Sequence, residues 1–180
     1  MSDISFIRPD EFWRTLGLRA QQTVAHLGCG PGFYILPAAK FVGSSGKVIG
    51  VDVRTDMLAE VENRARRENL TGIVKTIRAN LEATGSSGIA EQSCDWVLVA
   101  NILHQSDPAK ILAESKRIVR PNGSIVVVEW DVIATPMGPP PDKRITQPDV
   151  LAIAQTLGLS VAKQFAPSPY HYGIILKASL

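Results

Sequence analysis

Short apolar runs that alternate with helix-forming segments constrain the fold of this chain more than any other feature. Five such runs have the length and composition of buried strands; they span residues 23–27, 47–53, 72–77, 95–101 and 124–130. Strands that alternate with helices pair in parallel, and their connections cross the sheet with a right-handed sense. The sequence therefore predicts an α/β fold, a three-layer sandwich around a mostly parallel sheet.

The segments between these runs carry start and stop signals for helices. Helices are predicted from Pro9 to Gly17, over 33–43, from a cap at Thr55 or Asp56, and over 107–119 and 149–158. The polar stretch 80–93 predicts only a reduced helix, 121–123 a turn, and the proline-rich segment 131–148 a loop. Two closing runs, 160–165 and 172–178, are joined by seven residues or fewer and predict an antiparallel hairpin.

Length and charge exclude several classes of protein. The 180 residues, 45% of them hydrophobic, predict one domain over 1–180. A net charge of +2 does not indicate nucleic acid as a partner, and no apolar run approaches the roughly 20 residues that cross a membrane. The first residues lack the pattern of a signal peptide, and the two cysteines, Cys29 and Cys94, form no metal-ligand spacing, so we expect a cytoplasmic protein without a metal site.

A glycine-rich turn follows the first predicted strand. Gly28, Gly30 and Gly32 stand at alternate positions, and Asp52 ends the second strand 20 residues after Gly32. In open α/β sheets, ligands bind beyond the carboxyl ends of the strands, and a carboxylate at this place accepts the hydroxyls of a ribose. The sequence therefore predicts a nucleoside-containing cofactor, with a simple tight turn and a surface acid as the alternative.

The spacing of the glycines argues against a dinucleotide. The fingerprint of such sites has a small residue where this chain has Phe33, a position where helix and strand pack closely. An NAD-linked oxidoreductase is therefore a poor interpretation.

Four segments carry a resemblance to a known family: "HLGCGPG", "VIGVDVRTDML", "DWVLVANILHQ" and "RIVRPNGSIVVVEW". In order and spacing they resemble class I S-adenosylmethionine-dependent methyltransferases, and most closely the small branch grouped with ubiquinone/menaquinone-biosynthesis and arsenite methyltransferase-like proteins. The resemblance implies a Rossmann-like sheet of order 3-2-1-4-5-7-6 with strand 7 antiparallel. It also implies S-adenosylmethionine as cofactor and a small-molecule methyl acceptor.

The resemblance assigns cofactor contacts to particular positions. Asp52 would hold the ribose, Met57 would pack on adenine or serve as an ordinary core contact, and Asn101 would offer its backbone carbonyl to the methionine amino group or simply end its strand. The complete set that the resemblance implies is His26, Gly28, Cys29, Gly30, Gly32, Asp52, Val53, Met57, Asn80, Leu81 and Asn101.

His26 departs from the family pattern, which has an acid at this position. A neutral imidazole still accepts a hydrogen bond from the cofactor amine, whereas an imidazolium repels it. We therefore expect cofactor binding to depend on pH, unless the position is a drifted one that binds through water.

Catalytic candidates are few, because an activated methyl group needs positioning more than acid–base chemistry. His104, Tyr170 and His171 are the candidates, each with packing as its alternative role, and Glu129 and Trp130 could flank an acceptor. Arsenite-methylating enzymes use three cysteines, so arsenic chemistry is disfavoured here. A cofactor-binding protein without activity is the alternative function, and a homodimer is left open.

Overall fold

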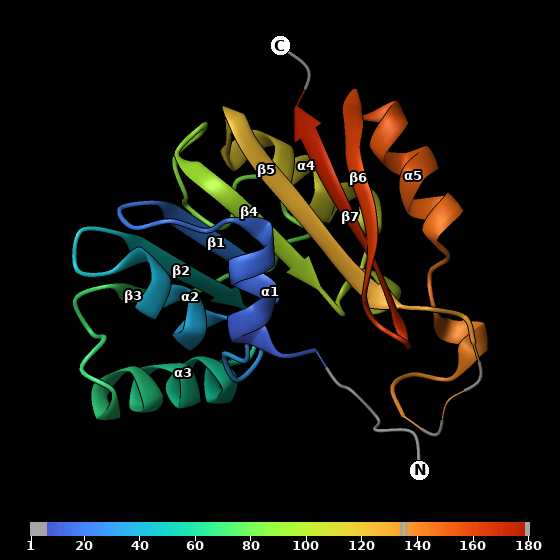
Figure 1. Ribbon diagram of the computed structural model, residues 1–180. Helices are drawn as coiled ribbons and strands as arrows, with labels where there is room; N and C mark the ends of the chain where they lie inside the picture. Colours follow the sequence, from blue (N-terminus) through green and yellow to red (C-terminus); the bar gives the residue numbers. More distant parts are fainter. Residues whose placement is uncertain (1–6, 134, 136, 179–180) are drawn as a thin grey trace.

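The computed structural model describes residues 7–133, 135 and 137–178, and these form a seven-stranded sheet of order β3-β2-β1-β4-β5-β7-β6 (Figure 1). The strands are β1 (Thr23–Leu27), β2 (Lys47–Asp52), β3 (Val74–Arg78), β4 (Cys94–Ala100), β5 (Val119–Trp130), β6 (Leu159–Ser168) and β7 (His171–Ala178). Strands β1 to β5 pair in parallel, and β7 lies antiparallel between β5 and β6. The predicted fold class, strand order and closing hairpin are confirmed.

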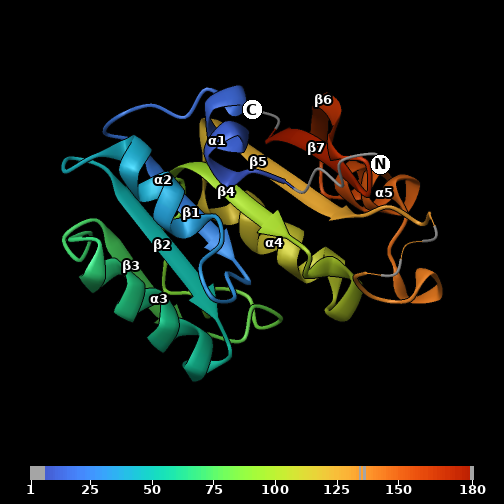
Figure 2. The same cartoon turned by 60° about the horizontal axis from the view of Figure 1, so that its bottom comes forward.

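Helices cover both faces of this sheet (Figure 2). They are α1 (Pro9–Leu16), α2 (Ile35–Val42), α3 (Thr55–Arg67), α4 (Pro108–Ile118) and α5 (Gln147–Thr156), with short 3-10 turns η1 (Leu103–Gln105) and η2 (Pro141–Lys143). One apolar core lies between the sheet and α1, α2 and α3, and a second lies between the sheet and α4 and α5. Strand β1 and the central parts of β4 and β5, residues 97–100 and 123–129, are almost wholly buried, because helices pack on both of their faces.

Three expectations about local structure were wrong: the cap of α3, a reduced helix in 80–93 and a turn at 121–123. Helix α3 begins at Thr55, and its N-cap is Arg54, which makes no side-chain cap. The 80–93 connection contains turns and no helix among its residues, all of which are described. The buried carboxylate of Glu114 stabilises this connection instead, since it accepts hydrogen bonds from the Gly85 N–H (3.1 Å) and the Ser87 hydroxyl (2.5 Å).

The expected turn at 121–123 lies inside β5. This strand begins at Val119, and its pairing with β4 shifts between Cys94 and Trp96, so the extra residues form an irregularity in a continuous strand. Because a bulge keeps both flanking segments in the ladder, the turn signal of Pro121 and Gly123 is absorbed without a break.

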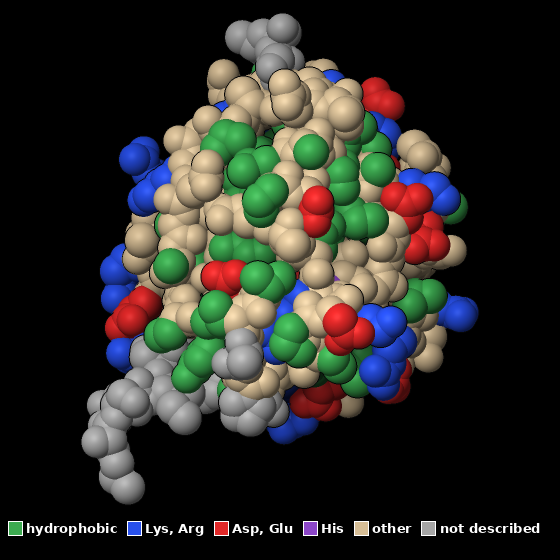
Figure 3. All heavy atoms as spheres, turned by 90° about the vertical axis from the view of Figure 1, so that its right-hand side faces the viewer, with side chains coloured by type: hydrophobic (Ala, Val, Ile, Leu, Met, Phe, Trp, Pro, Cys, Tyr) green, Lys and Arg blue, Asp and Glu red, His purple; other side chains and the backbone are tan. Residues whose placement is uncertain are grey.

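The closing hairpin brings distant residues to the carboxyl edge of the sheet. His171 at the start of β7 pairs with Trp130 at the end of β5. Strand β6 is the exposed edge, and the side of the molecule that carries β6 and α5 shows hydrophobic side chains among polar and charged ones (Figure 3). Within the described residues, no helix is both long and apolar enough to cross a membrane.

Candidate active site

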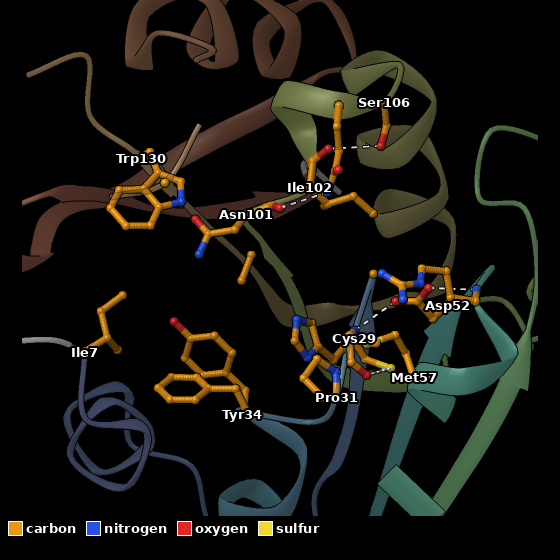
Figure 4. A pocket seen from close by; sticks show the side chains of 18 of the residues that line it. Ile7, Cys29, Pro31, Tyr34, Asp52, Met57, Asn101, Ile102, Ser106 and Trp130 are labelled. Atoms are coloured by element: carbon orange, nitrogen blue, oxygen red, sulfur yellow. Dashed lines mark hydrogen bonds between the residues drawn. The ribbon is translucent and has the colours of Figure 1, made fainter. Parts of the chain in front are cut away.

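A cavity of about 900 Å³ opens at the carboxyl ends of β1, β2, β4 and β5 (Figure 4). Asp52 and Met57 lie at one end of it, Trp130 lies at the other, and Asn101 lies between them. The residues that line it are Ile7, His26, Gly28, Cys29, Gly30, Pro31, Phe33, Tyr34, Asp52, Val53, Arg54, Met57, Ala100, Asn101, Ile102, Gln105, Ser106, Trp130, Met137, Gly138 and His171. Most of the predicted cofactor contacts are thus brought together.

The turn between β1 and α2 requires glycine for two different reasons. Gly28 has φ +71°, and a Cβ there would lie 2.2 Å from Cδ1 of Ile102. Gly32 has φ +86°, and a Cβ there would lie 2.9 Å from Cγ2 of Val61 in α3. The first glycine keeps the turn close to the segment after β4, and the second lets α3 pack against the turn.

Phe33 occupies a different position from the one expected. Its side chain is 47% exposed and lines the cavity, whereas the close contact between helix and turn is made at Gly32. The size of Phe33 is therefore no obstacle to packing here. The expectation that a large residue at position 33 excludes a dinucleotide was wrong, because the close contact is made at Gly32.

The carboxylate of Asp52, at the end of β2, is hydrogen-bonded to the glycine turn. Its Oδ2 accepts the Gly30 N–H at 2.8 Å, and its Oδ1 accepts the Arg54 N–H at 2.9 Å. A carboxylate oxygen can accept more than one hydrogen bond, so both oxygens can still receive hydroxyl groups of a ligand.

A second cavity, of about 190 Å³, adjoins the first. The two share Gly28, Asp52 and Ile102, and the smaller one is lined by Asn80 and Leu81. The residues expected after β3 therefore lie next to the Asp52 end of the main cavity, where Met57 also lies.

Cys29 is a buried thiol in the turn. Burial and the nearby charge of Asp52 raise its pKa to about 12, and its Sγ donates a long hydrogen bond of 3.5 Å to the Gly30 carbonyl. Because a neutral thiol is a weak nucleophile, Cys29 shapes the turn and has no covalent role at neutral pH.

His26 is a buried polar residue whose ring has no partner in the described part of the chain. Neither Nδ1 nor Nε2 makes a hydrogen bond, and the residue is 3% exposed at the cavity wall. Burial lowers its pKa to about 3. The expectation that His26 titrates near neutral pH is therefore corrected, since the ring stays neutral between pH 5.5 and pH 8.

Asn101 also presents an unpartnered polar atom. Its backbone adopts φ +54°, and its buried Oδ1 has no hydrogen-bond partner among the described residues. The main chain is held by the Val128 carbonyl, which accepts the Asn101 N–H at 2.9 Å. Buried polar atoms are rarely left unpaired, so Asn101 and His26 together indicate a polar ligand in this cavity.

The far end of the cavity is aromatic. The rings of Trp130 and His171 lie 4.1 Å apart, and Nδ1 of His171 is 2.7 Å from the Ser168 hydroxyl. Burial and the charge of Arg144 lower the pKa of His171 to about 4. Tyr170 is near by, donating its N–H to Ser168, but it does not line the cavity.

His104, a predicted catalytic candidate, does not line the main cavity. Its Nδ1 is 2.9 Å from the buried carboxylate of Glu129, which also accepts the N–H groups of Ile102 and Leu103 at 2.7 and 2.6 Å. This carboxylate holds the segment after β4 in place, and His104 faces it rather than the cavity.

Several lining residues were not foreseen from the sequence. Tyr34 and Ile102 lie next to the glycine turn and Asn101, so their neighbours gave a signal, whereas Ile7, Met137 and Gly138 reach the wall from segments that carry no local signal for a site. The connection after β5 folds back so that Gly138 lies against the Trp130 ring, and periodicity cannot predict such a contact.

Comparison with known proteins agrees with this architecture. Residues 25–127 match a family described as "Methyltransferase domain". A crystal structure of a SAM-dependent methyltransferase from Aquifex aeolicus has a TM-score of 0.85 at 25% identity, covering 94% of this chain and 89% of that one.

Two curated relatives belong to the branch that the sequence resembles. Ubiquinone/menaquinone biosynthesis C-methyltransferase UbiE of Marinomonas sp. is 29% identical over 63% of this chain and 45% of its own length. Arsenite methyltransferase of Halobacterium salinarum is 32% identical over 72% of this chain and 32% of its own length. The chain spans between about a third and a half of the length of these two relatives.

The family model covers more than half of the chain, and the sheet order and glycine turn agree with the resemblance. The chain therefore belongs to the methyltransferase-domain family, within the class I S-adenosylmethionine-dependent methyltransferases.

Proposed function

We propose that this chain binds S-adenosylmethionine in the main cavity and transfers its methyl group to a small-molecule acceptor. One observation carries the proposal. The cavity wall combines a glycine turn, a carboxylate that ends β2, and two side chains, those of His26 and Asn101, with buried polar atoms that lack a hydrogen-bond partner within the described chain. A ligand with a ribose and an amino-acid end supplies hydrogen bonds to each of them.

The nucleoside end fits the region around Asp52. Its carboxylate would accept the two ribose hydroxyls, and adenine would enter the smaller cavity beside Asn80, Leu81 and Met57. Charge-assisted hydrogen bonds of this kind are each worth roughly 1.5–3 kcal/mol, so Asp52 makes a large contribution to affinity.

The amino-acid end fits the region between His26 and Asn101. One nitrogen of a neutral imidazole can accept a hydrogen bond from an ammonium group, and Oδ1 of Asn101 can accept another. Cys29 and Pro31 of the glycine turn lie in the same part of the wall. The partners at this end are therefore polar but uncharged.

The bound cofactor supplies a methyl group activated by a sulfonium. A lone pair of the acceptor forms a bond to the methyl carbon while the carbon–sulfur bond breaks and sulfur keeps its electrons, which leaves S-adenosylhomocysteine. The chain holds the two reactants in line and keeps water out, and such positioning is the main source of rate in a displacement of this type.

The acceptor would lie at the Trp130 end, where the wall is apolar. His171 is the candidate that lines the cavity, whereas His104 faces Glu129 and Tyr170 lies behind Ser168. With its pKa lowered to about 4, His171 is a weak base, so its role is to orient the acceptor by a hydrogen bond. The extension of the cavity to this end favours an enzyme over a protein that only stores the cofactor.

Ligand-dependent melting of the purified protein tests the function. S-adenosylhomocysteine at 100 times its Kd should stabilise the fold by about 2.7 kcal/mol, and NAD should have no effect. Asp52→Ala should weaken binding in calorimetry by about 10- to 150-fold, whereas Asp56→Ala, which removes an exposed acid paired with Arg54, should leave it unchanged. Equal affinity in wild type and Asp52→Ala would contradict the assignment.

We also propose a cytoplasmic protein, because Cys29 and Cys94 are buried free thiols of the kind that a reducing compartment preserves. No nucleic-acid partner is proposed. A homodimer stays a prediction, for which sedimentation of the purified chain is the direct measurement.

A further inference from the structure

We propose that Ser168 is a positioning residue whose hydroxyl fixes the tautomer of His171, so that the wall of the main cavity presents the Nε2–H group of this ring as a hydrogen-bond donor. The inference rests on the proposed function, in which His171 orients the methyl acceptor by a hydrogen bond, and it assigns the direction of that bond. It starts from the serine and the histidine that close the hairpin between β6 and β7.

These two residues face each other at the tip of the hairpin. Ser168 is the last residue of β6, His171 is the first residue of β7, and the two are paired across the hairpin. The tip is held by two hydrogen bonds, since the Tyr170 N–H donates to the Ser168 hydroxyl oxygen at 3.2 Å and the Tyr170 carbonyl accepts the Asp131 N–H at 2.8 Å. Both Ser168 and His171 are buried. The serine hydroxyl therefore lies at a position that the turn itself determines.

The ring of His171 is held between this hydroxyl and Trp130. His171 and Trp130 are paired across β7 and β5, and their ring centres lie 4.1 Å apart with an angle of 39° between the planes. Nδ1 of His171 lies 2.7 Å from the Ser168 hydroxyl oxygen, which is the length of a good hydrogen bond. The two contacts together define the orientation of the ring in the cavity wall.

The hydrogen bonds of the serine decide which of the two atoms donates. A hydroxyl has one hydrogen to donate and two lone pairs that accept. The Ser168 oxygen already accepts the Tyr170 N–H, and among the described residues the hydrogen-bond acceptor for its own hydrogen is Nδ1 of His171. Because a buried hydroxyl is rarely left without a partner for its hydrogen, the Ser168 O–H donates and Nδ1 accepts.

This direction fixes the proton of the ring on Nε2. Burial, and after it the charge of Arg144, lowers the pKa of His171 to about 4, so the ring is neutral at pH 7. A neutral imidazole carries a single N–H group, and a ring whose Nδ1 accepts a hydrogen bond has that group at Nε2. The opposite tautomer would direct an N–H at Ser168 and leave the hydroxyl hydrogen without an acceptor in the described part of the chain.

Nε2 is the nitrogen that a ligand can meet. His171 lines the main cavity, and Nε2 makes no hydrogen bond with another described residue. The buried side-chain atoms that lack a partner among these residues belong to His26 and Asn101, so Nε2 of His171 keeps contact with solvent. The wall thus offers an N–H donor beside the Trp130 ring, and a molecule bound there has to direct a lone pair toward it.

The tautomer can be read directly by NMR. Long-range 1H–15N spectra of protein labelled with 15N-histidine distinguish an unprotonated Nδ1 from an unprotonated Nε2, and the chain has three histidines. His26→Phe and His104→Ala remove two of the three ring patterns in turn, which assigns the third pattern to His171. At pH 7 we expect His171 of the wild type to carry its proton on Nε2 and to have an unprotonated Nδ1.

Variants of the serine test whether its hydroxyl is the cause. Ser168→Ala removes the donor and should lower the ratio of the Nε2–H to the Nδ1–H tautomer by about fivefold, the factor that one ordinary hydrogen bond provides. Ser168→Thr keeps the hydroxyl and should keep the wild-type pattern. Ser160→Ala is the matched control, because it removes an exposed hydroxyl of the same strand, which donates a long hydrogen bond of 3.5 Å to the Lys177 carbonyl, and it should leave the His171 pattern unchanged.

An Nδ1–H tautomer of His171 in the wild type overturns the proposal, and so does an unchanged tautomer ratio in folded Ser168→Ala. The wild-type spectrum stands as a test even if the Ala variant does not fold. Stabilisation by S-adenosylhomocysteine is measured on the same samples, so a protein that ignores this ligand fails the proposed function, whereas one that binds it and shows the Nδ1–H tautomer fails only the role of Ser168.

Discussion

The two ends of the cavity are built in different ways. At the Asp52 end, Gly28, Gly30 and one carboxylate within two consecutive βα units line the wall, while Gly32 packs against α3. At the Trp130 end, side chains from β5, β7 and the proline-rich connection meet across large sequence separations, and a buried arginine holds the connection by its carbonyls. The first end depends on backbone conformation, and the second depends on packing.

This difference indicates which substitutions each end tolerates. A main-chain surface can be disturbed by one added methyl group, because backbone atoms have no alternative rotamer. A side-chain surface can change its chemistry while the fold persists. The division agrees with a common cofactor end and a variable acceptor end in proteins of one architecture.

The strongest test of the main-chain end is Gly28→Ala. The new Cβ would lie 2.2 Å from Ile102, at a positive φ, so we expect a loss of about 3 kcal/mol in the free energy of unfolding and about 100-fold weaker binding of S-adenosylhomocysteine. Gly17→Ala is the matched control, because Gly17 also has a positive φ (+80°) but open space around it; it should lose only about 1 kcal/mol.

A second substitution sharpens this test. Ile102→Val removes Cδ1, the atom closest to the added Cβ, so the double variant Gly28→Ala/Ile102→Val should recover part of the lost affinity. Equal stability of Gly28→Ala and Gly17→Ala in urea unfolding would show that the turn does not depend on this contact.

A medium effect is expected at Glu129, whose carboxylate holds the segment after β4. Glu129→Gln replaces an acceptor of three hydrogen bonds by a group that has to donate at one of its positions, and we expect a loss of about 2 kcal/mol in stability. His104→Ala removes only one of these donors, so it should cost less and leave the affinity for S-adenosylhomocysteine within about twofold of wild type. A large loss of methyl transfer in His104→Ala, at unchanged affinity and stability, would restore His104 as a catalytic residue.

The smallest effect near neutral pH concerns His26. Because its folded pKa is about 3 and the ordinary value is 6.5, the unfolded chain takes up the proton first. The stability contribution of neutral His26 is fully present above pH 6.5 and is lost as the pH falls toward 3, by at most roughly 1.4 kcal/mol per pH unit. His26→Phe should flatten the acid side of the stability profile between about pH 4 and pH 6. His171 and Glu114, whose pKa values are also lowered, contribute to the slope that remains.

Cofactor affinity should not follow this profile. With a pKa of about 3, the imidazole of the free protein is neutral between pH 5.5 and pH 8, so calorimetry should show affinities within about twofold across that range. Weaker binding at pH 5.5 that disappears in His26→Phe would show that the ring is protonated at that pH.

The sequence by itself determined the fold class and the cofactor end, and the strand order came from the resemblance to a known family. Periodicity located the strands, and Gly28, Gly32 and Asp52 could be placed at one edge because parallel strands present their carboxyl ends together. Local signals failed where long-range contacts outweighed them. The turn signal of Pro121 and Gly123 was absorbed in β5, and the 80–93 connection was stabilised by Glu114 without a helix.

Only the tertiary structure decided the environment of His26 and the position of Arg144. A histidine at position 26 of the sequence does not reveal that its ring is buried without a hydrogen-bond partner. The loss of solvent that lowers its pKa depends on every residue packed around the ring. In the same way, Arg144 is one of many basic residues in the sequence. It becomes buried beside Trp130 because the connection that carries it folds back over β5 and satisfies its donors with backbone carbonyls.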